Sequence, residues 1–198
     1  MKVAMLHTFS EKKGLINKDV SGGFGTVSNF GAGLAANFLS KFKKKTISYP
    51  PLSLAYAAAI FKQKGINAIS YINEVPDADL IIMHSSIVDY PDEIAWIRKI
   101  KNERKSKIGV VGPFASIQPN IYLEVADFVI KGEPEQALIN FDLLRIPRGL
   151  VESPTIEDLN SLPFPAWQTF NYHKFAYWPY FSPSILVSSW EHDSHHVG

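Results

Sequence analysis

The sequence predicts an α/β domain built on a parallel sheet, and two observations carry this prediction. Five short apolar runs read as strands, and amphipathic helical segments lie among them. Parallel neighbours need crossover connections, which helices supply. We therefore predict a Rossmann-like, flavodoxin-like five-stranded parallel sheet in the order 2-1-3-4-5, with helices on both faces. An extended linker rich in aromatic residues and proline follows it.

The first strand is expected over Lys2–His7, and a polar stretch then continues to about Thr26. A loop of this length in a compact domain is usually functional or disordered. The next predicted helix, Ser28–Phe42, has an apolar stripe at four-residue spacing, which comprises Phe30, Leu34, Phe38 and Phe42.

A second helix is expected to open at Pro50–Pro51, because proline lacks the N–H that a first helical turn leaves without a partner. Its predicted core face comprises Leu52, Tyr56, Ala59 and Ile60. Gly65 should end this helix.

The remaining predicted elements are four strands and two helices. The predicted strands are Ile66–Ile72, Asp79–His84, Lys107–Gly112 and Asp127–Ile130, and the predicted helices begin at Pro91 and span Pro134–Leu144. The helix at Pro91 carries acidic residues in its first turn and basic residues near its end, as the helix dipole favours.

Beyond Arg145 the composition changes, because six prolines interrupt a run of aromatic residues. We expect three segments: a ligand-binding domain over residues 1–145, a linker over 146–183, and a final strand with a tail over 184–198. The predicted strand Ser184–Ser189 has no partner within the chain.

Composition excludes several classes of function. The 198 residues include 20 Lys and Arg against 19 Asp and Glu, a net charge of +1, so no general basic field for nucleic acid is expected. The absence of cysteine excludes disulfides, a thiol nucleophile and an iron–sulfur cluster held by the chain's own thiolates. The longest apolar stretch, Leu52–Phe61, is half of the about 20 residues that span a membrane. We expect a cytoplasmic protein with a small-molecule partner and no membrane span.

In an open parallel sheet, ligands bind beyond the carboxyl ends of the strands. Small and hydroxylated residues concentrate there, and the residues expected to bind the ligand are Gly22, Gly23, Gly25, Thr26, Ser85, Ser86, Gly112, Pro113, Gly132 and Glu133. For any single loop, the ordinary preference of turns for Gly, Ser and Pro is the simpler explanation. His7 and His84, at two predicted strand ends, could also approach a ligand.

Two further motifs match known binding patterns, but neither is interpreted as a binding site. Gly31–Ala36 matches the dinucleotide fingerprint Gly-x-Gly-x-x-Ala, but it lies inside a predicted helix and not directly after a strand. The histidine-rich segment Glu191–His196 has no supporting shell for a metal ion, so no metal ligand is assigned.

Several segments together resemble the N-terminal region of radical S-adenosylmethionine enzymes that carry a cobalamin-binding domain. They occur in the order Tyr49–Ala58, Met83–Ser86, Val110–Ser116, Asp127–Glu135 and Ile156–Trp167. The Gly-Glu-x-Glu turn at residues 132–135 and the Leu-Pro-Phe-Pro-Ala run at 162–166 are the most specific of them.

The resemblance implies that the domain binds cobalamin, and that the linker leads into a barrel whose first strand precedes a Cys-x-x-x-Cys-x-x-Cys motif. That motif holds a [4Fe–4S] cluster used with S-adenosylmethionine. This sequence has no such cysteines, so we expect a truncated chain that is catalytically silent alone. The Asp-x-His-x-x-Gly motif of classical cobalamin domains is also absent after the first strand, where His7–Ser10 stand. Histidine ligation of cobalt is therefore not expected. The alternative is a flavodoxin-like module that binds another nucleotide-like ligand or serves for interaction.

Overall fold

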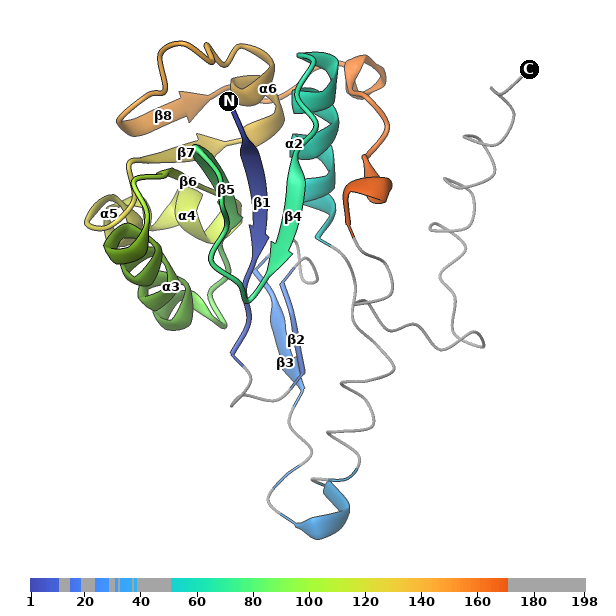
Figure 1. Ribbon diagram of the computed structural model, residues 1–198. Helices are drawn as coiled ribbons and strands as arrows, with labels where there is room; N and C mark the ends of the chain where they lie inside the picture. Colours follow the sequence, from blue (N-terminus) through green and yellow to red (C-terminus); the bar gives the residue numbers. More distant parts are fainter. Residues whose placement is uncertain are drawn as a thin grey trace.

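The computed structural model describes residues 1–10, 15–18, 24–28, 31, 33–36, 38 and 51–170. Its centre is a parallel sheet of six strands in the order β4-β1-β5-β6-β7-β8 (Figure 1). The strands are β1 (Val3–His7), β4 (Ile69–Ile72), β5 (Leu80–His84), β6 (Lys107–Val111), β7 (Phe128–Gly132) and β8 (Gly149–Ser153). The predicted α/β class is confirmed, and the five predicted strands lie in the predicted order.

The sixth strand, β8, was not predicted, because its residues were assigned to the linker. It pairs in parallel with β7, from Phe128 opposite Gly149 to Gly132 opposite Ser153. Its residues alternate between half-buried and exposed, which is the pattern of an edge strand with one face on the core. The sheet therefore extends past residue 145.

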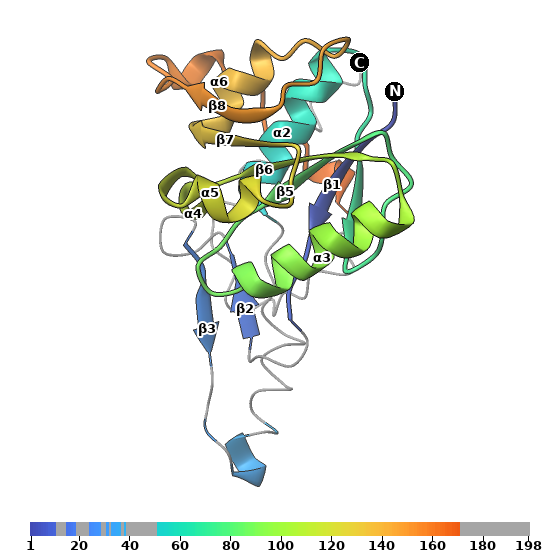
Figure 2. The same ribbon diagram turned by 90° about the vertical axis from the view of Figure 1, so that its left-hand side faces the viewer.

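Helices cover both faces of the sheet (Figure 2). The helices are α2 (Leu52–Gln63) and α6 (Pro134–Ile139) on one face, and α3 (Tyr90–Glu103), α4 (Pro113–Ile117) and α5 (Pro119–Leu123) on the other. A hairpin of β2 (Leu15–Asn17) and β3 (Thr26–Ser28) extends from the carboxyl edge of the sheet (Figure 1). No helix among the described residues has the length and apolarity needed to cross a membrane.

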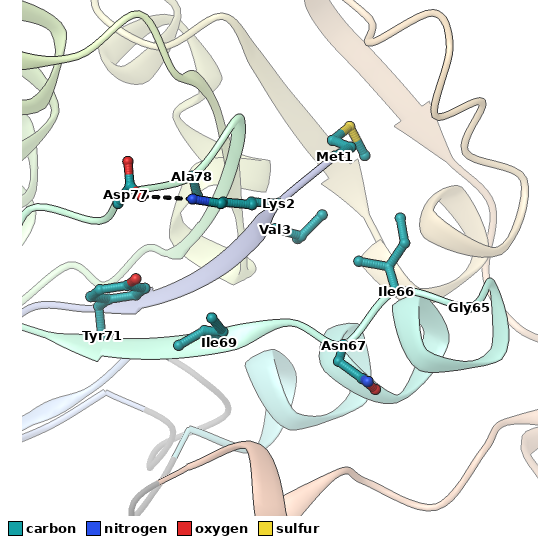
Figure 3. A pocket seen from close by; sticks show the side chains of 10 residues that line it. All are labelled: Met1, Lys2, Val3, Gly65, Ile66, Asn67, Ile69, Tyr71, Asp77 and Ala78. Carbon is teal, nitrogen blue, oxygen red and sulfur yellow. Dashed lines mark hydrogen bonds and ion pairs between the residues drawn. The ribbon is translucent and has the colours of Figure 1, made fainter.

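The amino edge, where the strands begin, has a pocket of about 300 Å³ beside the start of β1 (Figure 3). At this pocket the Nζ of Lys2 donates a hydrogen bond to Oδ2 of Asp77 over 2.8 Å, and both side chains are well exposed. Exposed pairs of this kind contribute little stability. Since ligands of open parallel sheets bind at the opposite edge, this pocket is not the candidate site.

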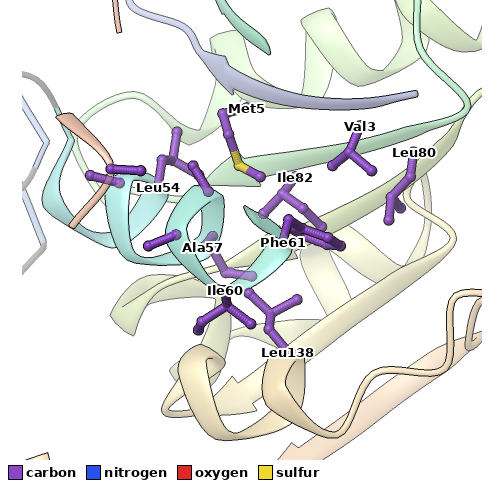
Figure 4. Packing of buried hydrophobic residues seen from close by; sticks show 14 of the residues in the cluster. Val3, Met5, Leu54, Ala57, Ile60, Phe61, Leu80, Ile82 and Leu138 are labelled. Carbon is purple, nitrogen blue, oxygen red and sulfur yellow. The ribbon is translucent and has the colours of Figure 1, made fainter. Parts of the chain in front are cut away.

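The core has two layers because side chains alternate along each strand. Val3 and Met5 of β1 face α2, whereas Ala4 and Leu6 face the α3 side. Figure 4 shows the first layer, in which side chains of β1 and β5 meet Phe61 of α2 and its neighbours. These side chains are almost completely buried, so the two apolar layers hold the sheet between its helices.

The end of α2 follows the sequence prediction. Gly65 has a φ of +78°, and its N–H donates to the carbonyl of Lys62 while the N–H of Ile66 donates to the carbonyl of Phe61. These two bonds form a Schellman motif, which glycine completes without strain. The turn uses the first residues of the predicted strand, so β4 begins at Ile69.

The predicted core face of α2 is only partly right. Ala59 and Ile60 are buried, but Leu52 is 44% exposed and Tyr56 is half-buried. An alanine-rich run lets α2 bury most of its circumference, centred on Leu54. Leu52 and Tyr56 instead face a pocket described below.

Helix α6 is shorter than predicted, since it ends at Ile139 and not at Leu144. The ammonium group of Lys64 donates to the carbonyls of Ile139 and Phe141, at 2.7 and 3.0 Å. These bonds satisfy carbonyls that a continuing helix would have used itself.

After β8, a later part of the predicted linker packs against α2. The N–H of Ala166 donates to the carbonyl of Ala55 over 3.0 Å, and Phe170 is buried in the α2 layer. This segment contains two 3₁₀ turns, η1 (Leu159–Ser161) and η2 (Trp167–Thr169). The expected strand Ser184–Ser189 and the segment Glu191–His196 lie outside the described residues, as does most of the predicted helix Ser28–Phe42.

Candidate functional site

A pocket of about 310 Å³ lies at the carboxyl edge of the sheet, and we call it the carboxyl-edge pocket. Three of its residues end or follow strands, namely His84, Gly112 and Gly132, and three come from the first turns of α2, namely Leu52, Ser53 and Tyr56. Its volume is at the lower end of the range for small-molecule sites. The pocket would therefore hold one part of a large ligand.

Two glycines shape this pocket through their backbone conformation. Gly112 has a φ of +114° and Gly132 a φ of +100°, both in the region that favours glycine. A Cβ on Gly132 would lie 2.2 Å from the carbonyl oxygen of Ser153, and one on Gly112 would lie 2.9 Å from Cε1 of His84. Neither position tolerates a side chain, so at Gly112 and Gly132 no side chain projects above the strand ends.

The turn after β7 and the first turn of α6 each supply one acidic residue to the pocket wall, Glu133 and Glu135. Glu133 is fixed, because its Oε2 accepts a hydrogen bond from the N–H of Ile156 over 2.5 Å and its carbonyl accepts one from Ser153 Oγ over 2.5 Å. Burial raises the pKa of the Glu135 carboxyl above its ordinary value, its own backbone N–H opposes that shift, and the nearby Glu133 adds to it. The wall is therefore acidic and partly desolvated.

A serine–histidine pair forms another part of the wall. Ser53 Oγ lies 2.8 Å from Nδ1 of His84, and the Nε2 of this buried histidine is inaccessible to solvent. His7, at the end of β1, is also buried and does not line the pocket. Burial lowers the pKa of His7 well below 6.5, and the charges of Lys18 and His84 add to this effect. His7 is consequently neutral at neutral pH.

The structure brings four of the ten expected ligand-site residues to the pocket: Gly112, Pro113, Gly132 and Glu133. Ser85 and Ser86 are fully buried below the edge. Ser85 Oγ accepts a hydrogen bond from the N–H of Ala115 over 2.9 Å, and Ser86 Oγ donates one to Oε1 of Glu93 over 2.9 Å. These two hydroxyls hold neighbouring loops together.

The remaining four expected residues come from the loop after β1. Gly25 directly precedes β3 and does not line the pocket, and Thr26 is the first residue of β3. Gly22 and Gly23 lie outside the described residues. The hairpin is tied to the edge by a hydrogen bond from the N–H of Ile87 to the carbonyl of Phe24, over 3.1 Å.

Next to this contact lies a buried charge cluster that sequence analysis missed. Lys18 projects from the hairpin loop, and its Nζ lies 2.6 Å from Oε1 of Glu93 and 3.6 Å from Oδ2 of Asp89. It also donates to Thr8 Oγ1 over 3.3 Å. All four residues are almost completely buried. Charges so far from water persist only when they are paired and hydrogen-bonded.

Glu93 is the centre of this cluster. Besides Lys18, it accepts hydrogen bonds from the backbone N–H and the hydroxyl of Ser86 and from the hydroxyl of Tyr122. Burial raises the pKa of the Tyr122 hydroxyl, and the negative charge of Glu93 raises it further, so Tyr122 stays protonated as the donor. The cluster joins the hairpin, β1, β5, α3 and α5 at the carboxyl edge.

Comparisons with known proteins give no family assignment. No protein-family model and no curated protein matches this sequence. Within the part of the chain that the structure describes, no group of three or more His, Asp and Glu side chains is arranged to hold a metal ion.

Proposed function

We propose that this chain binds cobalamin at the carboxyl edge of its sheet, as the N-terminal module of a radical S-adenosylmethionine enzyme. The motif resemblance supports this proposal, and the observation that carries it structurally is the carboxyl-edge pocket. Two of the resembling segments, Val110–Ser116 and Asp127–Glu135, supply the turns at Gly112 and Gly132 that border the pocket. Parallel sheets bind ligands at this edge.

The residues present fit cobalamin in part. The pocket has room for a peripheral portion of the cofactor, and the low turns at Gly112 and Gly132 leave space above the strand ends. When bound, cobalamin would supply a cobalt centre that carries an alkyl group. The chain's own role is to bind and orient the cofactor, since its sequence has no cysteine to hold a reducing cluster.

We expect the chain to bind cobalamin without giving cobalt a histidine ligand. Nδ1 of His84 lies within hydrogen-bond distance of Ser53, and its Nε2 is buried. Ligation through His84 would have to break the contact with Ser53 or move the ring. Nδ1 of His7 is also buried, and this side chain does not line the pocket.

The test is a titration of the chain with hydroxocobalamin, followed by visible spectroscopy and by co-elution in gel filtration. We expect saturable binding that persists in His7→Ala and His84→Ala. Leu52→Trp, at an exposed position of the pocket wall, should weaken binding at least about tenfold, which is about 1.4 kcal/mol. Leu159→Trp is the matched control, because Leu159 is exposed and does not line this pocket.

No binding at any accessible concentration would refute the cobalamin proposal and favour the alternative of an interaction module or another ligand. A spectrum of histidine-ligated cobalt that disappears in either histidine variant would be consistent with cobalamin binding. It would refute our expectation that no histidine of the chain ligates cobalt.

A further inference from the structure

Among the residues that the structure describes, those that line the carboxyl-edge pocket carry charge of one sign. Two of them are acidic, Glu133 and Glu135, and none of the described lining residues is Lys or Arg. Lys131 is adjacent in sequence, but its Nζ pairs with Oε1 of Glu152 over 3.2 Å. Clefts lined by charges of one sign attract the opposite charge and repel their own. The described part of the lining therefore disfavours a phosphate group.

The two carboxyl groups have different roles. Glu133 accepts a hydrogen bond from the N–H of Ile156, so its position is set by the protein. Glu135 is half-buried in the same wall, and burial and the field of Glu133 both disfavour its charged form. A ligand group that donates hydrogen bonds or carries positive charge would offset this cost. Glu135 is thus the residue whose ionised form a bound ligand would stabilise.

Ser53 adds a second polar group to the pocket. Its hydroxyl lies 2.8 Å from Nδ1 of His84, so the ring and the hydroxyl orient each other. Glu135 offers an acceptor to the N–H groups of a primary carboxamide or an amine, and the Ser53 hydroxyl lies in the same pocket wall.

We propose that the carboxyl-edge pocket takes a hydrogen-bond-donating group, a primary carboxamide or an amine, and excludes phosphate, with Glu135 as the specificity-determining acceptor. The identification of the ligand as a corrin rests on the proposed function, whereas the charge selectivity of the pocket does not. Corrin rings carry carboxamide arms that fit this chemistry. The phosphodiester of cobalamin, and the phosphate of a flavin nucleotide, would have to lie elsewhere.

The experiment uses the ¹⁵N-labelled full chain with three small probes: propylammonium, propionamide and inorganic phosphate. We expect propylammonium and propionamide to shift the amide signals of Gly132 and Glu135, and phosphate to leave them unchanged. Glu135→Gln should weaken propylammonium binding about tenfold. Glu103→Gln, which removes the same charge from an exposed position in the last turn of α3, should have no effect.

A pH series separates a direct contact from a general effect on folding. Affinity for propylammonium should fall as the pH drops and Glu135 becomes protonated, and this dependence should be lost in Glu135→Gln. Phosphate shifts at Gly132 and Glu135, or no shift with either donor probe, would overturn the proposal. If the donor probes bind but hydroxocobalamin does not, the charge selectivity stands and the cobalamin proposal fails.

Discussion

Substitution of Lys18 by methionine tests the buried charge cluster. Lys18→Met keeps the length of the side chain but removes the ammonium group that lies 2.6 Å from Glu93. Removal of one partner from a buried ion pair usually costs about 3–5 kcal/mol, because the other charge stays buried. Glu93 keeps three donors, two from Ser86 and one from Tyr122, so we expect the lower end, about 3 kcal/mol.

The assay is urea and thermal unfolding of Lys18→Met, Glu93→Gln and the double variant. For a chain of this size, about 3 kcal/mol lowers the melting temperature by about 6–12 °C. The double variant should be more stable than the sum of the single losses predicts, since it leaves no unpaired charge at residue 93. Lys2→Met, which removes a well-exposed ion pair with Asp77, is the control and should cause no resolvable change. A loss of less than about 0.5 kcal/mol in Lys18→Met, the range of an ordinary surface substitution, would refute the buried pair.

The other predictions concern a glycine turn and a buried histidine. Gly132→Ala should destabilise the fold by about 2 kcal/mol or more, because its Cβ would lie 2.2 Å from the carbonyl oxygen of Ser153. The control, Gly149→Ala, should lose about 1 kcal/mol, because Gly149 has a φ of +78° but open space around its Cα. Equal losses in urea unfolding would contradict this explanation. Below pH 6.5 the unfolded chain binds a proton on His7 that the folded chain does not. The free energy of unfolding should therefore decrease as the pH is lowered, by up to about 1.4 kcal/mol per pH unit. The raised pKa of Glu135 has the opposite effect, since it lowers stability as the pH rises above 4.5. This contribution cancels when the stability–pH profile of His7→Gln is subtracted from that of the unsubstituted chain. Identical profiles would show that burial does not lower the pKa of His7.

The sequence was sufficient for the fold class because the central strands are continuous apolar runs, as in β5, where every residue is buried. It was insufficient for β8, a five-residue edge strand between Pro147 and Pro154 that buries only one face. Short edge strands lack both the length and the hydrophobicity that distinguish a strand from a linker.

The candidate site was predicted in part for a similar reason. Gly112 and Gly132 follow strands directly, so the carboxyl-edge rule finds them without knowledge of tertiary contacts. Lys18 could not be found in this way, because it lies in a polar loop and pairs with Glu93, 75 residues away. Glu93 itself was interpreted as a first-turn acidic residue that favours the helix dipole, although the structure buries it among donors.

Hydrogen exchange with and without hydroxocobalamin tests the binding of cobalamin at the carboxyl edge most directly. We expect the cofactor to slow exchange at the backbone amides that flank Pro113 and Pro134, at residues 112, 114–116, 132, 133, 135 and 136 beside the carboxyl-edge pocket. Exchange at residues 65–67, beside the pocket of the amino edge, should stay unchanged. Protection at the amino edge, or no protection at saturating hydroxocobalamin, would contradict the account.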